Sequence, residues 1–164
     1  MVVFRAAVAP TLSGGMLRVA AFWALTAVAC FQSLSAIGGG IGIIATGGLG
    51  MPNSLLAGGP FTTFLGPGVI LFVVIGWTQT MAAILLIARR ESGLIWSSVA
   101  GFGMIIWIFA ETGIIRGLSW LQVLYFAGGC LQLLLVIVLL GGVSWLPRAP
   151  LPIRRASGRR RIGR

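Results

Sequence analysis

Residues 94–115 read LIWSSVAGFGMIIWIFAETGII, and this stretch decides the fold class of the chain. A helix needs about 20 apolar residues to cross the ~30 Å hydrocarbon core of a bilayer. Residues 17–38, 68–88 and 120–140 are apolar over comparable lengths. The links on either side of residues 94–115 are short, which favours antiparallel neighbours. The sequence therefore predicts an all-α protein, a transmembrane four-helix bundle with up-down-up-down topology.

The composition excludes a soluble domain. Hydrophobic residues make up 58% of the 164 residues and charged residues 9%, with a mean hydropathy of +1.05. Soluble domains carry about 25% charged residues. A closed β-barrel also satisfies a backbone in lipid, but its strands alternate apolar and polar residues, and these stretches are continuously apolar.

The arginines predict the orientation. Arg5 and Arg18 precede or begin the first span, and Arg89 and Arg90 lie between the second and third. Seven more arginines follow the fourth span, whereas only Arg116 lies on the other side. Cytoplasmic loops carry the excess of basic residues. We therefore predict a multi-pass protein of a bacterial plasma membrane with both termini in the cytoplasm.

A cleaved first span is the competing interpretation. The basic start, the apolar run and the small residues Ser33 and Ser35 are features of a signal peptide. The chain, however, stays apolar past this point, through Ile37 and residues 41–45. An uncleaved first span fits this pattern better.

The segments outside the spans differ in character. Residues 1–16 form a short N-terminal cytoplasmic segment, and residues 39–67 form an external connection rich in glycine yet apolar. We expect this connection to lie on the outer membrane interface or to cap the bundle, with helical turns near residues 51–57. Residues 141–164 are basic and rich in proline, which predicts a disordered cytoplasmic tail. Its arginines should bind anionic lipid headgroups rather than nucleic acid; they are Arg154, Arg155, Arg159, Arg160 and Arg161.

Each span carries polar residues on a face of small side chains at helical spacing, the pattern by which membrane helices pack closely. We expect these faces to turn inward; they include Phe72 in the second span and Ser97, Gly101 and Met104 in the third. The predicted polar intramembrane cluster consists of Glu111, Gln122, Gln32, Tyr125, Gln79 and Gln132. A rise of 1.5 Å per residue places the first four near the outer boundary and pairs Gln79 with Gln132 near the middle.

Glu111 is the only acidic residue within a span and the main candidate for function. An intramembrane carboxylate costs about 2.5–3.5 kcal/mol at a helix centre, so its presence needs a reason. One interpretation is a structural lock, in which Glu111 is hydrogen-bonded to Gln122 or screened by Arg116. The other is a substrate or proton site. For Trp77 and Trp107, near mid-depth, we expect packing within the bundle rather than stacking on a ligand.

No catalytic or cofactor motif is present in the sequence. There is no histidine, no C-x-x-C pair and no phosphate-binding loop, so we expect neither a metal, a cofactor nor an enzyme activity. Two hypotheses remain. The first is a non-enzymatic interaction or accessory subunit of a membrane complex. The second is a small oligomeric transporter or channel that uses Glu111 as its coupling group.

Two segments carry a resemblance to a known family. They are residues 106–111, which end at Glu111, and residues 119–128, which contain Leu-Gln-Val-Leu-Tyr-Phe. Together with Pro60-Phe61 and Leu65-Gly66-Pro67-Gly68, they resemble small four-span bacterial membrane proteins of the DoxX-like type. The resemblance implies the same size and topology over residues 17–140, and it implies no catalytic role for any residue.

Overall fold

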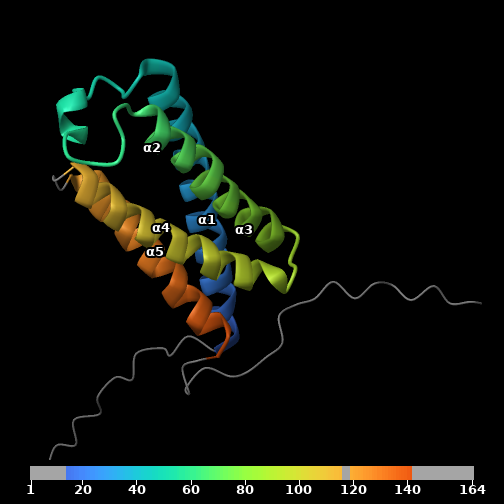
Figure 1. Cartoon of the computed structure of the whole chain (residues 1–164). Coiled ribbons are helices and arrows are strands. Elements are labelled where there is room, and N and C mark those ends of the chain that lie inside the picture. The colour runs from blue at the N-terminus through green and yellow to red at the C-terminus, as the bar shows by residue number, and fades with distance from the viewer. Residues whose placement is uncertain (1–13, 116–118, 142–164) are drawn as a thin grey trace, which may run out of the picture.

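The described residues, 14–115 and 119–141 of the computed structural model, form helices and no strands (Figure 1). The four-helix prediction is confirmed. Four helical stretches are long and apolar enough to cross a membrane, as in a multi-pass membrane protein. The elements in chain order are α1 (Gly14–Thr46), η1 (Asn53–Leu56), α2 (Leu65–Val69), η2 (Ile70–Gly76), α3 (Trp77–Ile87), α4 (Ser92–Ile115) and α5 (Trp120–Leu139).

Helices that are neighbours in the bundle run antiparallel to each other. The first span, α1, packs against the second span and against α5, while α4 packs against α3 and α5. The second span is built from α2, η2 and α3 without a break. At the end of the bundle where α1 begins, Arg18 Nη2 donates a hydrogen bond of 2.9 Å to the carbonyl oxygen of Leu139. This bond joins the start of α1 to the end of α5.

The first helix is longer than the sequence indicated. We expected it to end at residue 38, but it continues through the following glycines to Thr46, 33 residues in all, or about 50 Å. Close packing explains this. A Cβ at Gly40 would lie 2.7 Å from Phe72 Cβ and 2.8 Å from Phe72 N. These glycines therefore let two spans touch backbone to backbone instead of breaking the helix.

The link between α3 and α4 is a tight turn, as predicted. Arg89 adopts a positive φ of 52°, its N–H donates to Leu86 O (2.8 Å), and the Arg90 N–H donates to Leu85 O (2.9 Å). These two bonds satisfy the last carbonyls of α3 in a Schellman arrangement. The chain can therefore reverse within a few residues.

The connection between α1 and α2, residues 47–64, covers one end of the bundle and is the capping connection. The predicted helical turn is confirmed as η1, which follows Pro52 and packs against α4. Leu56 and Phe64 are buried, and a Cβ at Gly48 would lie only 2.6 Å from the Phe64 ring. Figure 1 shows this connection passing from the end of α1 across to the end of α4 and the start of α5.

The second span contains a π-helical stretch that the sequence did not predict. In η2 the extra residue per turn disturbs the regular hydrogen-bond ladder. The Thr78 hydroxyl donates to Val74 O (2.9 Å) and the Thr80 hydroxyl donates to Gly76 O (2.6 Å). The wider turn also rotates the helix faces, so Phe72, which we expected to face inward, is 38% exposed.

Several predictions concern residues outside the described ranges. They are the N-terminal segment through residue 13, the link residue Arg116, the disorder of residues 142–164 and the lipid-binding arginines of the tail.

Candidate functional site

Three glutamines form a hydrogen-bonded network in the middle of the bundle. Gln32, Gln79 and Gln132 come from α1, α3 and α5 and are no more than 1% exposed. The Gln79 amide donates to Gln132 Oε1 and the Gln132 amide donates to Gln79 Oε1, both at 3.2 Å. Gln79 also donates to the carbonyl oxygen of Ala100 in α4, at 3.2 Å. The network therefore ties together all four spans.

The predicted pairing of Gln79 with Gln132 is confirmed, but the predicted position of Gln32 is wrong. Gln32 donates to Gln132 Oε1 (3.2 Å) and accepts from the Gln79 amide (3.3 Å), so it belongs to the central network. The reason is the length of α1. Because the helix extends to Thr46, Gln32 lies near its middle and not near its outer end.

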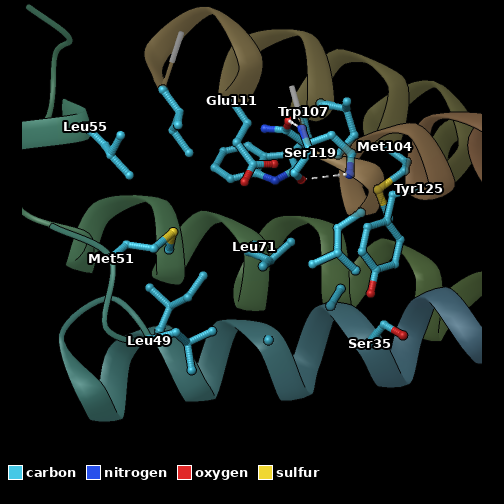
Figure 2. A pocket seen from close by; sticks show the side chains of 17 residues that line it. Ser35, Leu49, Met51, Leu55, Leu71, Met104, Trp107, Glu111, Ser119 and Tyr125 are labelled. Atoms are coloured by element: carbon cyan, nitrogen blue, oxygen red, sulfur yellow. Dashed lines mark hydrogen bonds between the residues drawn. The ribbon is translucent and has the colours of Figure 1, made fainter. Parts of the chain in front are cut away.

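A cavity of about 570 Å³ lies between this network and the capping connection. Figure 2 shows its walls: α4 contributes Met104, Trp107 and Glu111, the second span contributes Leu71, and α1 contributes Ser35. The capping connection closes it from one side with Met51 and Leu55, among others. No sequence pattern indicated this cavity, because five separate segments of the chain form it, namely α1, the capping connection, the second span, α4 and the start of α5.

Glu111 is half-buried and lines this cavity. It makes no hydrogen bond or ion pair with any residue that the structure describes. The expected lock with Gln122 is not formed. Instead, Gln122 Oε1 accepts a hydrogen bond of 2.8 Å from the Ser119 N–H, and Ser119 Oγ accepts from the Gln122 N–H. This capping box satisfies the free donors at the start of α5 and engages the Gln122 side chain locally.

Two aromatic side chains lie in the same cavity. Trp107 is 8% exposed and precedes Glu111 by one helical turn, so both project from one face of α4. Tyr125 of α5 lines the cavity and stacks on Phe31 of α1, with ring centroids 6.3 Å apart and an interplanar angle of 20°. Trp77 is different. It is 64% exposed on the outside of the bundle, so the expectation that it packs inside is wrong.

The described part of the cavity wall carries charge of one sign. Of the lining residues that the structure describes, only Glu111 is charged. Arg18 lies at the opposite end of the bundle, bonded to Leu139, and Arg89 and Arg90 lie in the turn at that end. Within the part of the chain that the structure describes, no group of three side chains with metal-binding potential comes together.

A second, smaller hollow adjoins the cavity. It has a volume of about 230 Å³ and lies between α4 and α5, where Phe109 and Phe126 meet edge to face. Ile108 and Gln122 line both hollows. These two side chains therefore lie between the main cavity and the smaller hollow.

Comparison with protein-family models, with curated proteins and with solved structures finds no match. The resemblance to DoxX-like proteins thus stays a prediction.

Proposed function

We propose that this protein is a non-enzymatic integral membrane protein that binds a small amphipathic molecule in the cavity above the glutamine network. One observation carries the proposal: the only acidic residue within a span lies in an apolar cavity of about 570 Å³ without a partner among the described residues. Ligand pockets measure about 300–1,000 Å³ and are mostly apolar with a few polar groups. Ionisable groups inside a membrane commonly mark a substrate site.

The contacts of Gln122 support the ligand site over the structural lock. A lock through Gln122 would join that side chain to Glu111, but the two form no hydrogen bond, and Gln122 Oε1 instead accepts from the Ser119 N–H. The other form of the lock, screening by Arg116, concerns a residue outside the described ranges. The contacts of Gln122 favour the second sequence hypothesis, in which Glu111 serves a small molecule, over an accessory subunit. Transport across the membrane would use the same site, with a second copy of the chain completing the pathway.

We place the protein in a bacterial plasma membrane with both termini in the cytoplasm. The distribution of arginines supports this orientation, since Arg18, Arg89 and Arg90 lie at one end of the bundle and the cavity lies toward the other. The cavity then belongs to the external half of the protein. The arginines of the tail would bind anionic lipid headgroups on the cytoplasmic surface.

The proposal is tested with three amphiphiles that share an eight-carbon chain: octanol, octanoate and octyltrimethylammonium. The protein is reconstituted in nanodiscs of zwitterionic lipid, with empty nanodiscs as the blank, and binding is measured by titration calorimetry. At least one probe should bind saturably at one site per chain.

Two neighbouring glycines of α1 supply a matched pair of variants. Gly39 lines the cavity, whereas Gly38 is exposed and a Cβ there would have no neighbour within 4 Å. Gly39→Phe should abolish saturable binding because the ring fills the cavity, and Gly38→Phe should leave it unchanged. Absence of saturable binding for all three probes, or equal binding by wild type and Gly39→Phe, would overturn the proposal.

A further inference from the structure

We propose that the cavity selects monovalent organic cations, that is, an amine or quaternary ammonium group attached to an apolar body. This inference rests on the proposed function and names the chemical class of its ligand. It follows from three properties of the cavity, namely its charge, its aromatic side chains and its apolar walls.

The charge selects the sign of the ligand. Among the described residues that line the cavity, Glu111 is the only charged one, and Arg18, Arg89 and Arg90 belong to the far end of the bundle. In a medium of low dielectric constant, Coulomb attraction between unit charges is much stronger than in water. A cation beside Glu111 offsets the cost of an isolated carboxylate in the membrane, whereas an anion adds to it.

The aromatic side chains suit a cationic head. Trp107 and Glu111 occupy adjacent turns on one face of α4, so a single ammonium group can lie near both. Cations are attracted to the faces of aromatic rings, and tryptophan attracts them best. Tyr125 adds a second ring, and its stacking on Phe31 fixes the orientation of that ring before a ligand binds. The site is therefore preorganised for a head that carries methyl groups or hydrogens around a positive nitrogen.

The walls suit an apolar body. They include Met51, Met104, Leu55 and Leu71, contributed by the connection, α4 and the second span. Methionine side chains adapt to ligands of different shape. The described lining holds few polar side chains besides Glu111, and two of them, Ser119 and Gln122, bond to each other's backbone in the cap of α5. A ligand with one positive group and an aliphatic or aromatic remainder matches this lining.

The test compares the same three probes in wild-type protein. Octyltrimethylammonium should bind at least about tenfold more tightly than octanol, the difference expected for one charge-assisted contact, and octanoate should bind most weakly. The quaternary nitrogen carries no proton, so its charge is constant throughout the measurement. Octanol binding as tightly as the cation would overturn the inference while leaving the proposed function standing.

The chain offers a matched control for the carboxylate. It has two acidic residues, Glu111 in the cavity and Glu91 in the exposed turn between α3 and α4. Glu111→Gln should weaken binding of the cation about tenfold and leave that of octanol within about twofold. Glu91→Gln should change neither. Equal loss of both probes in Glu111→Gln, or unchanged binding of the cation, would refute the selection by charge.

A second variant keeps the inference testable if Glu111→Gln fails to fold. Trp107→Leu keeps an apolar wall but removes the ring, so it should lower affinity for the cation several-fold and leave affinity for octanol nearly unchanged. Unchanged binding of the cation would count against the inference. Failure of all probes, including octanol, to bind wild-type protein would instead contradict the proposed function itself.

Discussion

Gln79 satisfies more of the buried hydrogen-bonding groups than any other side chain of the central network. Its amide group has two hydrogens shared among three acceptors, namely Gln32 Oε1, Gln132 Oε1 and Ala100 O. Its own oxygen accepts from Gln132. Gln32 takes part in only two of these bonds. The two residues should therefore differ in what their loss costs.

We expect Gln79→Leu to lower the free energy of unfolding by about 1–2 kcal/mol, because interhelical hydrogen bonds in membranes contribute about 0.6 kcal/mol on average. Gln32→Leu should cost less. Reversible unfolding in mixed micelles, monitored by circular dichroism, measures both. A larger loss for Gln32→Leu than for Gln79→Leu would contradict the network as described.

Glu111 should destabilise the free protein, since its carboxylate has no partner among the described residues. We expect Glu111→Leu to leave the free energy of unfolding in detergent unchanged or to raise it by up to about 2.5 kcal/mol. Ser119→Ala should lower stability by about 1 kcal/mol through the lost cap of α5. A clear loss of stability in Glu111→Leu would restore the interpretation of Glu111 as a helix lock.

The crossing of α1 with η2 depends on the absence of a side chain at Gly40. A Cβ there would come within 2.9 Å of three atoms of Phe72, two of them backbone atoms, so the helices would have to separate. At Gly38, on the same helix, a Cβ would have open space.

Gly40→Ala should therefore destabilise the fold by about 1–3 kcal/mol, the usual cost of overpacking. Gly38→Ala should be neutral or slightly stabilising, because alanine favours the helix by up to about 1 kcal/mol over glycine. Unfolding in mixed micelles measures both variants. Equal effects of the two substitutions would mean that α1 does not cross η2 at Gly40.

Prediction of the buried face from the sequence was reliable where the same helical spacing of small and polar residues continues along a whole helix. Ser97, Gly101 and Met104 lie on the buried face of α4, as their spacing predicted. It failed where packing between helices overrides local signals. The glycines after residue 38 have the composition of a loop, and only their contact with the second span shows why they stay helical. The π-helical stretch η2 and the assignment of Gln32 to the central network likewise depend on partners that are distant in the chain.

The orientation of the whole bundle is a proposal with a direct test. The capping connection lies at the end of the bundle opposite Arg18 and the turn at Arg89. Reporter fusions within residues 50–60 should therefore read external, and fusions after Arg90 or at the C-terminus should read cytoplasmic. An external C-terminus would overturn the assignment of four crossings.

The unequal lengths of the helices create a hydrophobic mismatch. The first helix has 33 residues and α5 has 20, about 50 Å against 30 Å. The bond between Arg18 and Leu139 aligns these helices at the end of the bundle that carries Arg89, so the additional length of α1 projects at the opposite end together with the capping connection. The capping connection, which closes the cavity at this end, should then lie at the level of the lipid headgroups, and its distance from water should depend on the thickness of the bilayer.

A polarity-sensitive dye can measure this dependence. It is attached at Ser54→Cys in η1, in a background in which Cys30 and Cys130 are replaced by alanine. Its emission should shift to the blue as the acyl chains of the host lipid lengthen, whereas the same dye at Glu91→Cys should respond less because the helices are level there. If the emission of the dye at residue 54 does not change with acyl-chain length, the capping connection does not lie at the level of the headgroups. If the shift is found, the thickness of the membrane sets how open the site is to the aqueous phase.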